Sequence, residues 1–168
     1  MELKEFFLEK LEREVEVTRK AIERVPEGRN DWKPHEKSMG LGYLTALVAT
    51  MAGWVSFMLD QDELDLGDPA NGGLKPKTMS TRAELLDAMQ EAFARARNSL
   101  ESTTEEHLMK NWRFKIGGQV VTEAPRHVML SDAVFSHLAH HRGQLTVYLR
   151  LNDAKVPAIY GPSADEFR

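Results

Sequence analysis

Three of the six histidines lie within five residues, at His137, His140 and His141. On a helix, residues four apart project from one face, so the imidazoles of His137 and His141 can reach the same metal ion. At about 100° per residue, both lie within or at the edge of an apolar stripe, whereas His140 lies outside it. The spacing predicts an inward-facing histidine pair, and its chemistry would be the binding of zinc or nickel.

Histidine pairs at this spacing are common, so a second interpretation stays open, in which both imidazoles are buried, neutral and hydrogen-bonded without a metal. Two neighbours could contribute to a site for a cofactor or substrate. Arg142 could form two parallel hydrogen bonds with a ligand carboxylate, or an ion pair with Asp165 or Glu166. Gln144 could orient a ligand or bond a neighbouring backbone group.

The composition disfavours several other chemistries. The chain has no cysteine, so any thiol in a reaction must come from another molecule. A net charge of -4 gives no basic footprint for nucleic acid. The glycine pairs Gly72-Gly73 and Gly117-Gly118 lack the strand, loop and helix context of a phosphate-binding motif. The acids between Asp60 and Asp68 lack the ligand spacing of a calcium loop.

The histidine pair lies in the last of four segments with helical periodicity. These segments cover residues 5–25, 39–59, 81–100 and 125–152. The second has a wide apolar face and is predicted to be deeply buried, and the third opens with a capping box of Thr81 and Glu84. In the fourth, His127 and Leu130 are expected on the same face as His141.

Between the third and fourth segments the hydrophobic period changes. Trp112, Phe114 and Ile116 alternate with charged residues and are followed by Gly117-Gly118, which predicts a β-hairpin that covers one end of the helices. Residues 29–38 are predicted to be a loop that packs Trp32 on the helices, and residues 60–79 a long surface loop.

The length of 168 residues, 42% of them hydrophobic and 29% charged, predicts one domain over residues 1–168. The expected class is all-α, an up-and-down four-helix bundle with long loops and a small hairpin before the last helix. No apolar run is expected to reach the roughly 20 residues of a membrane span. The first ten residues mix acids and bases, unlike a secretory signal, so the expected location is cytoplasmic.

The chain resembles DinB-like proteins, chiefly in the run HLAHHRGQ from His137 to Gln144. Similar segments cover nearly the whole chain, at residues 31–35, 37–39, 53–54, 148–150 and 156–166. The resemblance implies a four-helix bundle, often a homodimer. It also implies a divalent metal, held by one histidine of the second helix and the histidine pair of the last. Some members of this family catalyse thiol-dependent transfer or isomerisation.

The chain departs from this family pattern at the second helix. The family histidine lies seven residues before the Gly-Trp pair, which corresponds to Leu47 or its neighbours, and no residue from Tyr43 to Thr50 is a histidine. Leucine cannot bind a metal, and His127 is expected about four turns from His141, too far for one ion. Two histidines and water would bind zinc or nickel weakly.

The residues and the resemblance to DinB-like proteins leave two functions open, of which the resemblance implies the first. The first is a divalent-metal-dependent thiol S-transferase that acts on a small electrophile, with His137 and His141 as ligands and an external thiol as nucleophile. The second is a metal-free family member that acts as a small-ligand-binding or dimerising bundle, in which Leu47 adds apolar volume. The expected partners are a second copy of the chain and a small molecule, without nucleic acid or membrane.

Overall fold

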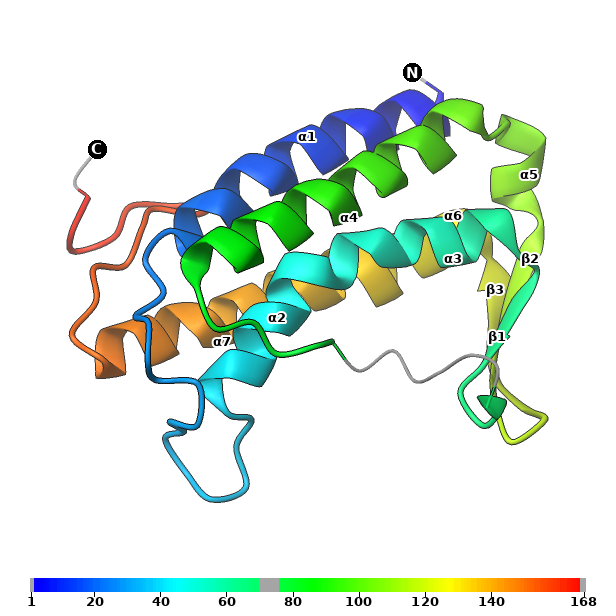
Figure 1. Ribbon diagram of the computed structural model, residues 1–168. Helices are drawn as coiled ribbons and strands as arrows, with labels where there is room; N and C mark the ends of the chain where they lie inside the picture. The colour runs from blue at the N-terminus through cyan, green and yellow to red at the C-terminus, as the bar shows by residue number, and fades with distance from the viewer. Residues whose placement is uncertain (1, 70–75, 167–168) are drawn as a thin grey trace.

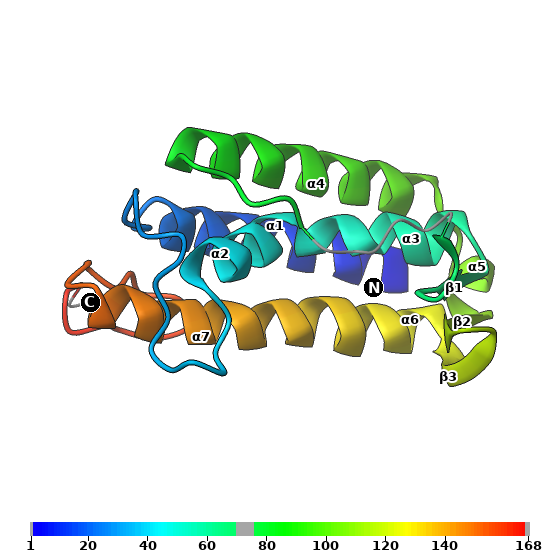
Figure 2. The same ribbon diagram turned by 60° about the horizontal axis from the view of Figure 1, so that its bottom comes forward.

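The computed structural model describes residues 2–69 and 76–166. Within these residues, four long helical runs lie side by side, and a small sheet closes one end (Figures 1 and 2). The runs are α1 (Leu3–Ile22); α2, η1 and α3 (Leu41–Thr50, Met51–Gly53 and Trp54–Asp60); α4 (Arg82–Ser102); and α6, η3 and α7 (Arg126–Met129, Leu130–Ser136 and His137–Leu151). The short helix α5 (Glu105–Met109) follows α4. The mainly helical class predicted from the sequence is confirmed.

The run from α2 to α3 is the apolar centre of the fold. The wide apolar face predicted for it is buried, at Leu41, Leu44, Leu47, Val48, Met51, Val55 and Met58. Contrary to the sequence expectation, the stretch Leu41–Asp60 is long and apolar enough to cross a membrane by length and composition. It is the one such stretch among the described residues, and 72% of its most apolar window is buried inside the protein. Packing against the other helices therefore accounts for its hydropathy.

Acidic side chains cap the starts of α1 and α4, from a distant residue at α1 and from within the first turn at α4. The backbone amides of Leu3 and Lys4 donate to the carboxylate of Glu105, at 3.0 and 2.9 Å, which satisfies two amides that a helix start leaves unpaired. At α4 the predicted capping box is confirmed: Thr81 Oγ1 accepts from the Glu84 amide at 3.2 Å, and the Glu84 carboxylate accepts from the Thr81 amide at 3.2 Å.

The predicted hairpin is also confirmed, as β2 (Asn111–Ile116) and β3 (Gln119–Pro125). Its turn glycines, Gly117 and Gly118, have φ angles of 59° and 80°, which suit a two-residue hairpin turn. The all-α prediction needs a correction, because β1 (Glu63–Asp65) pairs in parallel with β2 to make a three-stranded sheet.

Strand β1 lies in the segment predicted to be a loop, of which residues 70–75, with the pair Gly72-Gly73, lie outside the described residues. It is held to the hairpin by Asp65. The Asp65 carboxylate accepts hydrogen bonds from the backbone amides of Gly67, Gly117 and Gly118, at 2.7, 2.8 and 2.6 Å. These bonds hold the pKa of the Asp65 carboxyl below its ordinary value.

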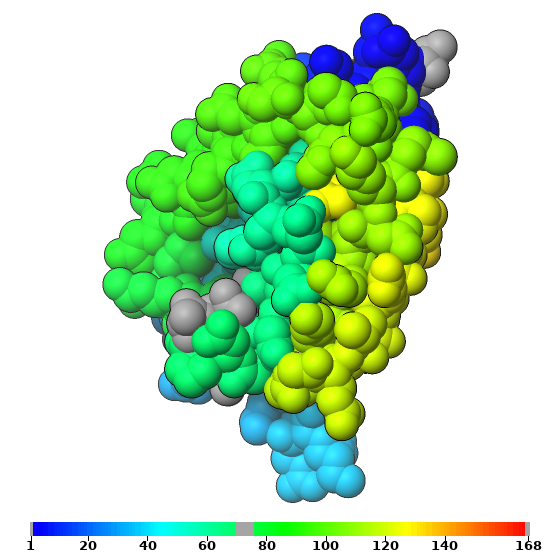
Figure 3. Space-filling view, turned by 90° about the vertical axis from the view of Figure 1, so that its right-hand side faces the viewer, coloured from blue at the N-terminus to red at the C-terminus, as the bar shows by residue number. Residues whose placement is uncertain are grey.

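The end of the molecule closed by the sheet faces the viewer in Figure 3. Beneath its surface, one buried arginine joins the sheet to the helices. Arg126, the first residue of α6, donates to the carbonyl oxygens of Met58 at 2.8 Å and Asn111 at 2.9 Å. It also donates to the Gln61 carbonyl at 3.2 Å and to the Asp62 carboxylate at 2.5 Å. The guanidinium thus links the end of α3, the start of β2 and the start of α6.

Candidate functional site

A cavity of about 880 Å³ lies between the α2–α3 run, the hairpin and the α6–α7 run. Most of the side chains that line it are aliphatic or aromatic, and they include Leu47 and Trp54. Its polar lining residues are Tyr43, Thr122, Asp132, His137 and His141. The predicted histidine pair therefore contributes to the wall of a largely apolar cavity.

The two histidines form a hydrogen-bonded pair. The Nε2 atoms of His137 and His141 are 2.9 Å apart, and Nδ1 of His141 lies 2.8 Å from Oε1 of Gln144. Because an amide oxygen only accepts, His141 carries its proton on Nδ1, and its Nε2 accepts a hydrogen bond from the Nε2–H group of His137. His140 is exposed and does not line the cavity. Gln144 thus orients the His141 ring, so its amide oxygen bonds an imidazole instead of a backbone group.

Burial lowers the pKa of His141 below its ordinary value of 6.5, and the neighbouring His137 and His140 act in the same direction, against the bond from Gln144. The unfolded chain therefore holds more protons at this position than the folded chain just below pH 6.5, so folding stability falls as pH falls. This gives a first testable prediction.

Lowering the pH from about 7.5 to about 5.5 is expected to reduce the urea midpoint more in the wild type than in His141→Gln, which cannot titrate. Urea unfolding followed by circular dichroism at both pH values measures the difference. His140→Gln is the control, because His140 is exposed and is the smallest of the causes that act on the pKa of His141, so this variant should keep most of the wild-type pH sensitivity. Equal pH sensitivity in the wild type and His141→Gln would contradict the coupling of His141 to folding.

The residues present do not make the three-ligand metal site that the family resemblance implies. A catalytic zinc site takes three protein ligands, and zinc-bound imidazole nitrogens lie about 3.3 Å apart in tetrahedral geometry. His137 and His141 could supply two, but the cavity also has the apolar Leu47 in its wall. In the part of the chain that the structure describes, no group of three His, Cys, Asp or Glu side chains could hold a metal ion.

Arg142 does not contribute to the cavity. It is 1% exposed, and its guanidinium donates to Glu14 Oε2 at 2.6 Å and Thr18 Oγ1 at 2.8 Å, both on α1. It also contacts the hydroxyl of Tyr160, which donates to Glu14 at 2.8 Å. Burial, followed by the bond to Glu14, raises the pKa of Tyr160 to about 12. The interpretation of Arg142 as a ligand clamp is therefore replaced by a role in joining α1, α7 and the C-terminal segment.

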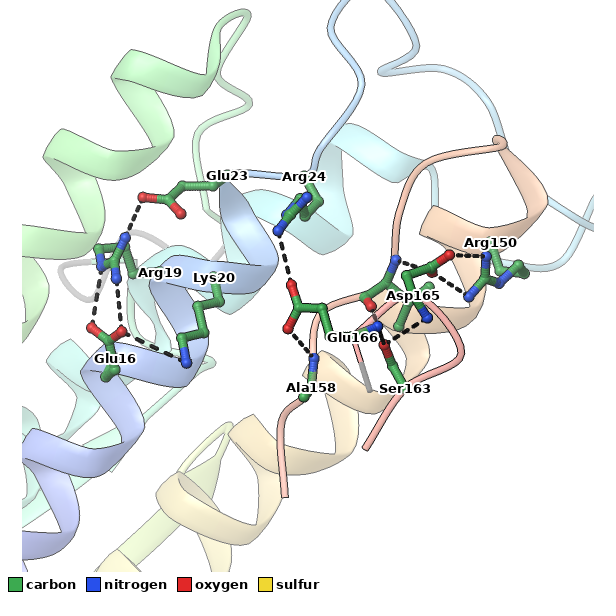
Figure 4. Close-up of polar contacts among 11 residues, drawn as sticks. Glu16, Arg19, Lys20, Glu23, Arg24, Arg150, Ala158, Ser163, Asp165 and Glu166 are labelled. Carbon is green, nitrogen blue, oxygen red and sulfur yellow. Dashed lines mark hydrogen bonds and ion pairs between the residues drawn. The ribbon is translucent and has the colours of Figure 1, made fainter. Parts of the chain in front are cut away.

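The alternative predicted for Arg142, an ion pair with Asp165 or Glu166, is also wrong. Both acids bind other arginines, as Figure 4 shows. Asp165 lies 2.5 Å from Arg150, and Glu166 lies 2.9 Å from Arg24. These pairs hold the C-terminal segment on the ends of α7 and α1, where the side chains of Arg150 and Arg24 are 50% and 37% exposed.

The sequence prediction missed Asp132 and misplaced His127. Segment η3 is a π-helix, whose hydrogen bonds span five residues, so each turn takes up more residues than an α-helical turn. Val128 and Asp132 line the cavity in consequence, while the Nδ1 of His127 lies 3.2 Å from the carbonyl oxygen of Leu108. The prediction for His127 was wrong because it continued a regular 100° period through η3.

Trp112 also has a polar group of interest. Its side chain lines the cavity and is 2% exposed. The indole Nε1–H is buried without a hydrogen-bond partner among the described residues, so it has a free donor. No motif in the sequence distinguished Trp112 from a packing residue of the hairpin.

The chain matches the sequence model of the DinB family over residues 1–167. A comparison with curated proteins finds no match. Among solved structures, a DinB-like protein from Bacillus cereus superposes with a TM-score of 0.71 at 20% identity, covering 93% of this chain and 97% of that one. A DinB-like protein from Bacillus subtilis gives 0.68 at 20% identity, covering 92% and 98%. These structural likenesses concern the fold alone, and with the match along the sequence they lead to one conclusion: the chain belongs to the DinB family.

Proposed function

We propose that this DinB-family protein binds a small, largely apolar molecule in the cavity beside His137 and His141. The observation that carries the proposal is the cavity itself, about 880 Å³ in volume, with a mainly aliphatic and aromatic lining that includes Leu47. Cavities of this size and character suit small organic ligands, whose few polar groups are fixed by a few polar side chains. The histidine pair, Tyr43, Thr122 and Asp132 are the polar side chains that such a ligand would meet.

Decanol, a neutral molecule with a long alkyl chain, is a suitable probe of this cavity. Its binding can be followed by fluorescence, because Trp54 and Trp112 line the cavity. Saturable binding is expected in the wild type. Ala133→Phe, which adds a ring to the cavity wall, is expected to weaken it by roughly tenfold, because the ring takes up space that the ligand needs. Fluorescence titration checks both results without adding a tryptophan.

Ala94→Phe is the matched control, because Ala94 is exposed on α4 and does not line the cavity. It should bind decanol like the wild type. A response that does not saturate, or one that is equal in Ala133→Phe and the wild type, would contradict the cavity as the binding site.

A second candidate function is the divalent-metal-dependent transfer of an external thiol to a small electrophile. It is favoured by one observation, the approach of the His137 and His141 Nε2 atoms to 2.9 Å. Elemental analysis of tag-free protein, after incubation with zinc or nickel and desalting, tests it. Near-stoichiometric metal retained by the protein would support this candidate and would justify an assay of thiol transfer. Loss of the metal on desalting would favour the metal-free ligand-binding function.

The resemblance to DinB-like proteins also suggests how the protein assembles. We propose that the four helical runs form the up-and-down bundle of DinB-like proteins and that the chain is a cytoplasmic homodimer, without nucleic-acid or membrane partners. The net charge of -4 supports the absence of nucleic acid. Light scattering after size-exclusion chromatography would test the dimer by its mass.

A further inference from the structure

The charge of the cavity lining indicates the kind of molecule that it selects. Asp132 is the acidic residue in the lining, and no lysine or arginine lines the cavity within residues 2–69 and 76–166. We infer that the preferred ligand is a lipophilic amine, whose cationic nitrogen pairs with the Asp132 carboxylate while its apolar part occupies the cavity. This inference rests on the proposed function, because it names the ligand class of the same cavity.

The Asp132 carboxylate is available to a ligand. Its side chain is exposed where it lines the cavity, and it forms no hydrogen bond or ion pair with the described residues. A carboxylate at such a position keeps its hydration until a cation arrives, so it needs no internal partner. Hydrogen bonds from an ammonium group to a carboxylate are stronger than bonds between neutral groups.

The aromatic part of the lining favours the same ligand class. Five aromatic side chains line the cavity: Tyr43, Trp54, Phe57, Trp112 and Phe114. The faces of aromatic rings attract cations, and this attraction increases where water is excluded. The same rings provide apolar surface for an alkyl or aryl chain. A ligand that is both cationic and apolar therefore uses both properties of the cavity.

The π-helix is the element that brings Asp132 to the cavity. Five residues separate Asp132 from His137, which in an α-helix would turn their side chains about 140° apart. In η3 the hydrogen bonds span five residues, and both side chains line the cavity. Since π-helical turns are rare and occur frequently at functional sites, the position of η3 supports a ligand-binding role for Asp132.

A ligand with a carboxylate is disfavoured by the same charges. Its negative group would approach Asp132 without a lysine or arginine from the described lining to offset the repulsion. A neutral ligand would gain the apolar contacts but no charge pair. The expected order of affinity is therefore amine, then alcohol, then carboxylate.

Decylamine, decanol and decanoate have the same alkyl chain and test this order directly. Titrations below the micellar range, followed by tryptophan fluorescence and by calorimetry, should show decylamine binding roughly tenfold more tightly than decanol. Asp132→Asn keeps the shape of the side chain and removes its charge. It should lose about tenfold in decylamine affinity and leave decanol affinity unchanged.

Asp87→Asn is the matched control, because it removes the same charge from an exposed position on α4 that does not line the cavity. It should keep the preference for decylamine, which shows that net charge alone does not set it. Thermal unfolding of Asp132→Asn checks that the variant is folded.

The outcomes separate this inference from the proposed function. Decylamine binding no tighter than decanol, or a preference that survives in Asp132→Asn, overturns the amine inference while saturable decanol binding supports the cavity. If none of the three molecules binds to the wild type, the proposed function fails and the inference fails with it.

Discussion

Replacing Arg142 by leucine is expected to lower the free energy of unfolding by about 3–5 kcal/mol, the cost of removing one partner from a buried ion pair. The guanidinium is 1% exposed, and the Glu14 side chain that faces it is 7% exposed. Without Arg142, the Glu14 carboxylate is left among helices with only the hydroxyl of Tyr160 as a donor from the present cluster. Thr18 also loses the bond that it accepts at 2.8 Å.

Urea unfolding of Arg142→Leu measures this loss. Arg150→Leu is the matched control, because Arg150 lies in the same helix but its side chain is 50% exposed, so a much smaller change is expected. The double variant Glu14→Leu/Arg142→Leu should recover much of the stability, since it leaves no unpaired charge in the buried position. Equal effects of Arg142→Leu and Arg150→Leu would show that the buried pair has no special contribution.

The elements that the sequence predicted well depend on residues close together in the chain. The Thr81 and Glu84 capping box lies within one helical turn, and the turn glycines Gly117 and Gly118 directly join the two strands of the hairpin. The buried face of the α2–α3 run follows from its apolar period. Each signal can be recognised without knowing where the other helices lie.

The elements that were missed depend on distant contacts or on a changed period. Strand β1 has three residues, and it exists because it pairs with β2 and because Asp65 binds the hairpin turn more than fifty residues later. Glu14 and Arg142 are 128 residues apart, so neither one alone indicates a buried pair. A charged residue is normally expected at the surface, and only the approach of α1 to α7 reverses this expectation.

The candidate site shows the same division. The four-residue spacing placed His137 and His141 together, and their nitrogen atoms are 2.9 Å apart. Asp132 was missed because the apolar stripe was continued backwards with α-helical geometry, which fails in the π-helix η3. Nothing in the hydrophobic pattern marks this local change of helical period, and yet the change decides which of two neighbouring turns faces the cavity.

Replacing Leu47 by histidine is expected to create a divalent-metal site in this cavity. Leu47 is 6% exposed and lines the cavity together with His137 and His141. A third imidazole would complete the ligand number of a catalytic zinc site. The free energy of zinc binding at structural sites is about 10–16 kcal/mol for four ligands, or roughly 3 kcal/mol for each ligand. One added ligand should therefore tighten zinc binding on the order of a hundredfold.

Calorimetry with zinc, for the wild type and Leu47→His, measures this gain. Thermal unfolding provides a second readout, because an imidazole among apolar side chains should lower Tm in the absence of zinc, and zinc should then raise it. In the Leu47→His background, His137→Ala and His141→Ala should each abolish the gain, whereas His140→Ala should preserve it, because His140 does not line the cavity. An affinity for zinc that Leu47→His leaves unchanged would mean that α2 does not present this position to the histidine pair. Equal loss from all three alanine variants would contradict the assignment of faces on α7.

A gain in zinc affinity that depends on His137 and His141 alone would mean that the helices are already arranged for a third ligand. A single side chain on α2 would then separate a metal site from an apolar cavity.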